Sequence, residues 1–239
     1  MIVPDAPAGI AAPDGLAPAP PAVLLAHRTV PASGALGSQE TLRQYPPTPQ
    51  RVTLRSWPRS ASPCWPPSSP CSPSRCPAPR RQTACPGADD VPTADNLPAV
   101  RATTRCLVNR ERTQRGLRAL KGSRRLRFSA TLHSQDMVDH RYFAHDSQDG
   151  SSFGERIRAT GYLARARGYQ LGENIAWGTG ELATPAQIVD AWMHSPGHRR
   201  NILNRRFRQI GMGIVPGAPD PIADGLPAAT YTTDFGARK

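Results

Sequence analysis

Residues 171–203 read LGENIAWGTGELATPAQIVDAWMHSPGHRRNIL, and this stretch decides the fold. Its first part, Gly172–Gly178, is bounded by glycines and mixes polar with large apolar side chains. That pattern is typical of a half-buried strand. The stretch therefore begins with a strand that carries a carboxylate, Glu173.

The second part of the stretch predicts a helix. Thr184 can cap it with its hydroxyl, and Pro185 is tolerated at the first helical position. Four apolar side chains then fall on one packed face: Ile188, Val189, Trp192 and Met193. The residues Ser195-Pro196-Gly197 end this helix and deliver His198 to a turn.

Two further helices are expected upstream. The first begins near Asn96, a possible cap, and stops at Gly116. The second runs from Ser129, again a possible cap, to Arg141. A turn at 142–145 (Tyr-Phe-Ala-His) and a short helix over 153–160 follow.

Two strands close the chain. Residues 210–215 alternate small and apolar side chains, and residues 229–235 return after a loop rich in proline and glycine. Helices that precede a hairpin argue for an α+β fold with an antiparallel sheet.

The front of the chain has a different composition. Residues 1–84 are rich in Pro, Ala, Ser and Arg without a sustained period of 2 or 3.6, and 21 of the 27 prolines fall in residues 1–98. Proline removes backbone donors, and little apolar surface is present to offset chain entropy. We expect a disordered segment over 1–84, either a linker or the product of a wrongly assigned start, and an ordered domain over 85–239.

The cysteines indicate an oxidising compartment. None of the five has the C-x-x-C spacing of a zinc clip. Cys106 is the only one inside the ordered domain, and Cys85 lies where order begins, so we predict a disulfide between them. Cys64, Cys71 and Cys76 would then remain in the front segment.

The net charge of +12 comes almost wholly from arginine. The arginines are spread over several expected helices, so specific nucleic-acid binding is not indicated, whereas weak attraction to a polyanionic cell envelope is plausible. No run of 18 apolar residues is present, so no membrane span is expected. The apolar patch at 20–26 is too short, and lacks the basic flank, for a signal peptide.

Several motifs together resemble the CAP superfamily (cysteine-rich secretory, antigen 5 and pathogenesis-related-1 proteins) in its bacterial, SCP-like form. They are the Leu107-Val-Asn-x-Glu-Arg112 helix, Tyr142-Phe-Ala-His145, Gly172-Glu-Asn174, Ser195-Pro-Gly-His198 and Tyr231-Thr-Thr-Asp-Phe-Gly236. The resemblance implies a secreted or envelope-associated protein with a three-layer α-β-α sandwich, in which a small antiparallel sheet lies between helices.

The resemblance also implies a site. In CAP proteins two histidines and the glutamate of the GEN motif converge in a cleft, and the histidines hold zinc in some members. His145, Glu173 and His198 match those positions, whereas Ser195 stands where many eukaryotic members carry a second glutamate. We therefore expect a cleft of His145, Glu173, His198 and Ser195, with His145 and His198 as weak ligands of Zn²⁺.

Other interpretations of these residues stay open. His198 could cap a helix end, Glu173 could be a buried acid that fixes a turn, and His133, His140 and His194 are expected at solvated helix positions. We expect a non-enzymatic module that binds a small molecule, a lipid or an envelope component, or a metal ion. The alternative is a metal-assisted peptide or ester hydrolase with Glu173 as the catalytic base. A serine hydrolase using Ser195 is not indicated, because no G-x-S-x-G elbow is present.

Overall fold

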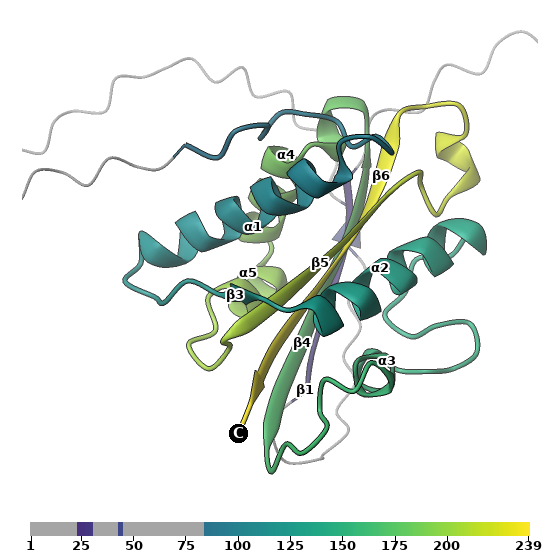
Figure 1. The fold of residues 1–239 in the computed structure, drawn as a ribbon. Helices are drawn as coiled ribbons and strands as arrows, with labels where there is room; N and C mark the ends of the chain where they lie inside the picture. The colour runs from purple at the N-terminus through teal and green to yellow at the C-terminus, as the bar shows by residue number, and fades with distance from the viewer. Residues whose placement is uncertain (1–22, 31–42, 45–83) are drawn as a thin grey trace, which may run out of the picture.

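The chain folds as an α-β-α sandwich, seen with the sheet between two helical layers in Figure 1. The computed structural model describes residues 84–239, together with the backbone of residues 23–30 and 43–44. One layer holds α1 (Leu97–Thr113), α4 (Pro185–His194) and α5 (Pro196–Ile202). The other holds α2 (Arg124–Asp139) and α3 (Phe153–Ala159). The expected fold class is confirmed.

Within the described residues, six strands form one sheet in the order β2-β1-β4-β6-β5-β3. The strands are β1 (Val23–Val30), β2 (Arg43–Gln44), β3 (Lys121–Gly122), β4 (Tyr169–Thr179), β5 (Gln209–Pro216) and β6 (Ala228–Arg238). All neighbours are antiparallel except β3 and β5. The GEN stretch therefore runs through the sheet as β4, with β6 on one side and β1 on the other.

The first residues of the helices test the N-cap residues that the sequence predicted. Thr184 caps α4 as expected, because its hydroxyl accepts a hydrogen bond from the Gln187 N–H. The expected start of α2 at Ser129 is wrong: the helix begins five residues earlier, where Ser123 accepts from Leu126 N–H. Asn96 precedes α1 but makes no side-chain cap, since its amide instead bonds the backbone of Val91 and Thr93.

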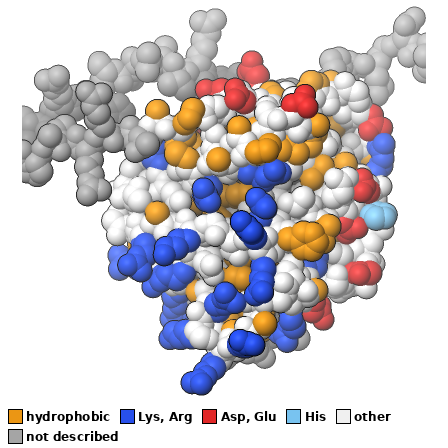
Figure 2. All heavy atoms as spheres, in the orientation of Figure 1, with side chains coloured by type: hydrophobic (Ala, Val, Ile, Leu, Met, Phe, Trp, Pro, Cys, Tyr) orange, Lys and Arg blue, Asp and Glu red, His pale blue; other side chains and the backbone are white. Residues whose placement is uncertain are grey.

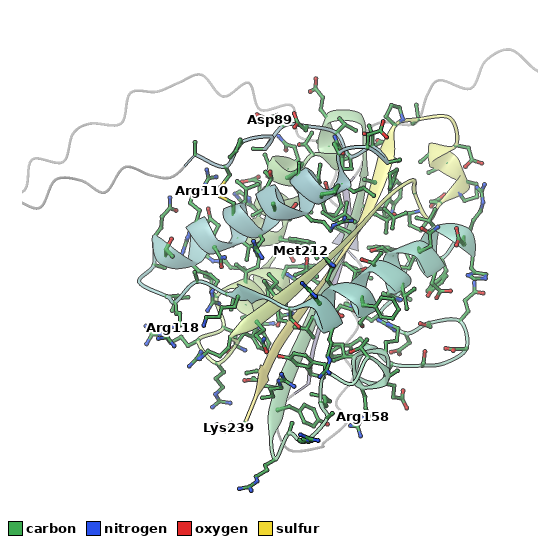
Figure 3. All side chains as sticks on the ribbon, viewed as in Figure 1. Asp89, Arg110, Arg118, Arg158, Met212 and Lys239 are labelled. Atoms are coloured by element: carbon green, nitrogen blue, oxygen red, sulfur yellow. A yellow bond between two sulfur atoms is a disulfide. The ribbon has the colours of Figure 1, made fainter. Side chains whose placement is uncertain are left out.

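The main apolar core lies between the sheet and the layer of α1, α4 and α5. Trp192 of α4 is fully buried, packs edge-on against Tyr231 of β6, and donates its indole N–H to the carbonyl of Ile175. Phe207 stacks on Phe235 at 5.4 Å between ring centroids. Figure 3 shows side chains filling the space on both sides of the sheet, with Met212 of β5 near its middle.

The opposite layer approaches the sheet more closely. A Cβ added at Gly211 or Gly213 of β5 would lie 2.1 Å from backbone atoms of α2. Only glycine permits this approach, which brings the side chains of α2 down onto β4 and β6. A polar cluster, described below, is buried under that helix.

A disulfide joins Cys85 to Cys106, the pair that we expected, with 5.8 Å between the Cα atoms. It attaches the segment that enters the domain to α1. The alternative partners, Cys64, Cys71 and Cys76, lie outside the described residues.

The front segment contains two strands that the sequence analysis did not predict. β1 pairs along its whole length with β4, from Val23 opposite Gly178 to Val30 opposite Leu171. We expected disorder throughout 1–84, whereas the structure describes strands at residues 23–30 and 43–44. Strand pairing between distant segments leaves no local period, which is why the pattern analysis missed it. The remainder of 1–83 lies outside the described residues, and the domain boundary at 85 stays a prediction.

Among the described residues, no helix is both long and apolar enough to cross a membrane.

Candidate functional site

The site is built around the carboxylate of Glu173, which points from β4 toward α2 and α3 and is completely buried. Its Oε1 accepts a hydrogen bond from His145 Nδ1 at 2.7 Å, and its Oε2 accepts one from the Arg156 guanidinium at 2.8 Å. Arg156, in α3, also donates to the backbone carbonyl of His145 at 2.8 Å. Glu173, His145 and Arg156 thus form a closed triangle of contacts.

The charge of Glu173 is stabilised inside the protein. Burial acts against its ionisation, but the positive charge of Arg156 and the hydrogen bond from His145 outweigh it, so the pKa of Glu173 lies below its ordinary value. The carboxylate remains ionised at neutral pH, and it holds the His145 ring with Nδ1–H as donor. In the neutral ring Nε2 of His145 is then the acceptor nitrogen, and in the structure this atom is buried without a hydrogen-bond partner.

A second carboxyl group lies beside the first. Asp234 of β6 stands directly opposite Glu173 in the β4–β6 ladder, so both side chains leave the same face of the sheet. Asp234 is fully buried, and burial, followed by the negative charge of Glu173, raises its pKa well above the ordinary value. Burial and the charge of Glu173 therefore oppose ionisation of Asp234, whereas Arg156 favours ionisation of Glu173.

His133 of α2 also belongs to this group. We expected it at a solvated helix position, and this prediction is wrong. Its side chain is buried, and Nε2–H donates to the Ala144 carbonyl at 2.9 Å. Burial lowers the pKa of His133 to about 4, so the ring is neutral at physiological pH. It lies on the buried stripe of α2, whose apolar members are Leu126, Ala130 and Met137. The other two histidines are exposed as expected, with the side chains of His140 and His194 57% and 71% exposed.

We call Glu173, Asp234, His145, His133 and Arg156 the buried polar cluster. Three of the five were not predicted as site residues. Asp234 belongs to a motif that we quoted, and His133 to a helical period, so both left a signal in the sequence. Arg156 left none, because an arginine in a short helix with two other charged residues reads as solvated.

His198 and Ser195 lie on the other side of β4, in the layer of α5. His198 Nδ1 is 2.8 Å from Ser195 Oγ, and the His198 carbonyl accepts from the side chain of Asn174 at 3.2 Å. Asn201 donates to the Glu173 carbonyl and to Asn174 Oδ1, at 3.1 and 2.9 Å. These amides attach α5 to β4. Asn174 and Asn201 are positioning residues that we had not predicted.

The four predicted cleft residues are therefore distributed in two pairs. His145 and Glu173 are in direct contact on the α2–α3 side, whereas the bonds described for His198 run to Ser195 and Asn174 on the α5 side. A shared cleft stays a prediction.

Weak zinc binding by His145 and His198 stays a prediction. Within residues 84–239, no group of three or more His, Cys, Asp or Glu side chains is arranged to hold a metal ion. Both oxygens of Glu173 already bind His145 and Arg156. His145 has the form of a metal ligand, because its imidazole is oriented by a carboxylate.

Comparison with known proteins found similarity over the second half of the chain. The model of the cysteine-rich secretory protein (CAP) family matches residues 106–221. The Bacillus subtilis (strain 168) protein YkwD is 42% identical over 109 residues, 46% of this chain and 40% of the relative. The B. subtilis membrane protein YlbC is 32% identical over 108 residues, 45% of this chain and 29% of the relative. The chain thus spans less than half of either relative.

Among solved structures, an extracellular protein with an SCP domain from Bacillus anthracis is similar, with a TM-score of 0.48 and 26% identity over 60% of this chain and 43% of that one. An outer surface protein of Borrelia burgdorferi has a TM-score of 0.48 and 19% identity, over 62% of this chain and 97% of that one.

Proposed function

Because residues 106–221 match the model of the cysteine-rich secretory protein (CAP) family, we propose that the protein is an extracellular binding module without catalytic activity. The observation that carries this proposal is the state of Glu173, the one candidate base. Its carboxylate is buried, and both oxygens are occupied by Arg156 and His145. A general base has to reach a substrate proton directly or through one water molecule, and its pKa should lie near the working pH. Glu173 meets neither condition.

Secretion is supported by the disulfide between Cys85 and Cys106, since such bonds persist in oxidising compartments. The family to which residues 106–221 belong is itself described as secretory. Both observations support our proposal that the domain works outside the cell or at the cell envelope.

The proposed role of Glu173 is to fix the orientation of His145. With Nδ1–H donated to the carboxylate, Nε2 presents a lone pair that has no partner in the structure. An unsatisfied buried acceptor costs free energy, and a hydroxyl or amide group of a ligand would remove that cost. We propose that His145 Nε2 is the polar contact for a small molecule, lipid or envelope component.

The alternative of a metal-assisted hydrolase is not favoured, because the described residues give neither an accessible base nor a set of metal ligands. Turnover measurements separate the two functions. The full chain is incubated with peptide and ester libraries, with and without zinc, and we expect no turnover above buffer. Turnover by the wild type that disappears in the folded variant Glu173→Gln would overturn the proposal.

Binding is tested by thermal shift against a panel of lipids and envelope components, with His145→Gln as the matched variant. A compound that raises the Tm of the wild type but not of His145→Gln supports the role of His145. Zinc is included at pH 7.5 and 5.5, since a histidine site loses metal affinity when the imidazole is protonated. Equal effects of zinc on wild type and variant would remove metal binding from the function.

A further inference from the structure

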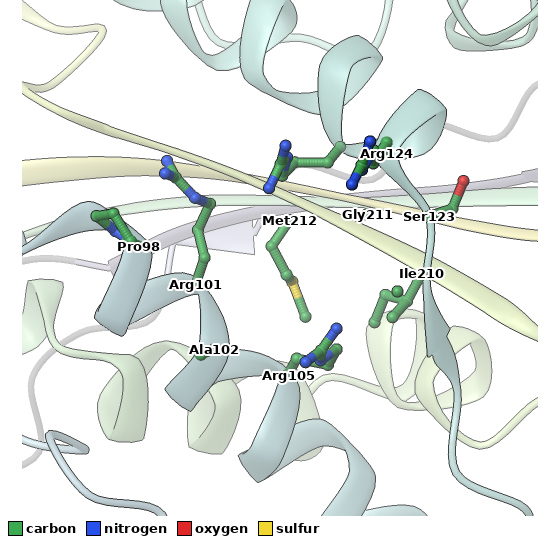
Figure 4. A pocket seen from close by; sticks show the side chains of 11 residues that line it. Pro98, Arg101, Ala102, Arg105, Ser123, Arg124, Ile210, Gly211 and Met212 are labelled. Carbon is green, nitrogen blue, oxygen red and sulfur yellow. The ribbon is translucent and has the colours of Figure 1, made fainter.

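A second site lies on the opposite edge of the sheet from β1. β3 pairs only its two residues with Gln209 and Ile210, so the edge of β5 beyond them is uncovered. α1 and α2 stand on either side of that edge, and a pocket of about 300 Å³ lies between them. Figure 4 shows Arg101 and Arg105 on the wall formed by α1, Arg124 on the wall at the start of α2, and Met212 of β5 between the walls.

The charge of this pocket is unusual. Four arginines line it, Arg101 and Arg105 from α1 and Arg124 and Arg127 from α2, and no acidic residue does. Within the described part of the chain, no hydrogen bond or ion pair joins any of the four guanidinium groups to a carboxylate. Figure 2 shows Lys and Arg side chains gathered on this face, while the acidic side chains lie toward its rim.

Such crowding is unfavourable in the empty protein. The four residues come from two helices far apart in the sequence, so their convergence is a property of the fold. Burial, and after it the charge of Arg127, lowers the pKa of Arg101, which shows that like charges face one another across the pocket. Bound anions would relieve this repulsion.

We propose that the pocket between α1 and α2 binds a ligand with two or more closely spaced phosphate groups, held by Arg101, Arg105, Arg124 and Arg127. Phosphate is favoured because the planar guanidinium fork donates two parallel hydrogen bonds to its oxygens. Arg101 and Arg105 are one helical turn apart, so both can reach the same ligand. The volume is at the lower limit for small-molecule sites, and four positive charges exceed what one phosphate needs.

Calorimetry with pyrophosphate as the probe tests this binding on the full chain at low ionic strength. The test variant is Arg101→Gln/Arg105→Gln. Its matched control is Arg199→Gln/Arg200→Gln, which removes the same charge from two exposed neighbours in α5. We expect the test variant to bind at least about tenfold more weakly than the wild type, and the control to stay within about twofold. Circular dichroism confirms that both variants are folded.

Two results would overturn the proposal: no binding of pyrophosphate by the wild type at millimolar concentration, or an equal loss in test and control variants. The second result would mean that only the net charge attracts the anion.

A further arm identifies the source of the phosphate. Phe128 of α2 is 59% exposed next to Arg127, where a lipid surface would cover it. If vesicles of cardiolipin, whose headgroup carries two phosphates, bind, and Arg101→Gln/Arg105→Gln and Phe128→Ser both weaken this binding, the pocket takes a lipid headgroup. If the vesicles do not bind while pyrophosphate does, the ligand is a soluble or polymeric phosphate. Both results support an anion site in the pocket.

Discussion

The two faces of the central sheet are made by the same strands and bury opposite kinds of side chain. On the side of α1, α4 and α5, β6 contributes Tyr231 and Phe235 to an apolar core around Trp192. On the side of α2 and α3, β4 and β6 contribute Glu173 and Asp234 to the buried polar cluster. Alternation along each strand produces both faces. The apolar face gains stability from any good packing, whereas the polar face depends on each charge and donor having its partner.

The largest effect is expected from removing the cation of the polar face. Arg156→Met leaves the Glu173 carboxylate buried without its counter-charge, which should cost about 3–5 kcal/mol. Trp192→Ala on the apolar face should cost a similar amount, about 3–5 kcal/mol, because it opens a cavity. Urea unfolding at pH 7 and pH 4 separates the two causes.

The pH dependence follows from the pKa of Glu173. Its folded pKa is lowered, so the ion pair stabilises the protein above the unfolded pKa, about 4.3, and that stability is lost as the pH falls through the folded pKa. Without Arg156 the buried acid takes up its proton more readily. The cost of Arg156→Met should therefore shrink from pH 7 to pH 4, while that of Trp192→Ala stays constant. An equal cost of Arg156→Met at both values would show that its charge is irrelevant.

The next largest loss of stability is expected from removing the disulfide that joins the entry segment to α1. Cys106→Ser opens a loop of 21 residues and should cost on the order of 3 kcal/mol in the chain-entropy account. Reduction of the disulfide in the wild type should lower its free energy of unfolding by the same amount. Peptide mapping without reductant that found Cys106 free, or joined to Cys64, Cys71 or Cys76, would contradict this pairing.

Unlike the variants above, Asp234→Asn is expected to increase the free energy of unfolding at pH 7. The folded pKa of Asp234 is raised, so its contribution to stability is complete below the unfolded pKa of about 3.9 and declines as the pH rises toward the folded pKa. Each unit of difference costs about 1.4 kcal/mol at a pH above both values. Asn cannot ionise, so the variant should be more stable than the wild type at pH 7 and lose that advantage near pH 4. A variant that is less stable at pH 7 would contradict a protonated Asp234.

The smallest losses of stability are expected from removing one helix cap in each helical layer. Ser152 caps α3 in a capping box with Glu155, and Thr184 caps α4 through Gln187 N–H. Ser152→Ala and Thr184→Ala should each cost about 1 kcal/mol in denaturant unfolding. The serine variant should lose more, because Glu155 also loses the hydroxyl that it accepts from. A larger loss at Thr184 would show that burial of the cap matters more than the number of its bonds.

Much of the fold could be predicted from local chemistry. Thr184 and Pro185 located α4, and the glycines around Glu173 located β4. The start of α2 was missed because Arg124, Arg125 and Arg127 interrupt the apolar pattern, although Leu126 between them begins the buried stripe. Three arginines at the start of a helix are tolerated here since their side chains point away from the core, and two of them reach the pocket.

The candidate site could be predicted only in part. Contact between His145 and Glu173 was expected from the motifs, and the structure has it. The neutralising role of Arg156 and the proximity of Asp234 depend on which strands pair and in which register, and a single sequence does not contain this information. The burial of His133 could have been predicted from the sequence, because His133 shares a helix face with Ala130 and Met137.

The pairing of β1 with β4 has a consequence for how the chain folds. Arg28 lies opposite Glu173, about 145 residues further along the chain, so closing this contact restricts far more of the chain than any other pairing of the sheet. Contacts of such long sequence separation form slowly. β1 is synthesised first and has to wait until β4 has been made. We expect β1 to join an already folded sheet, as the last step of folding rather than its nucleus.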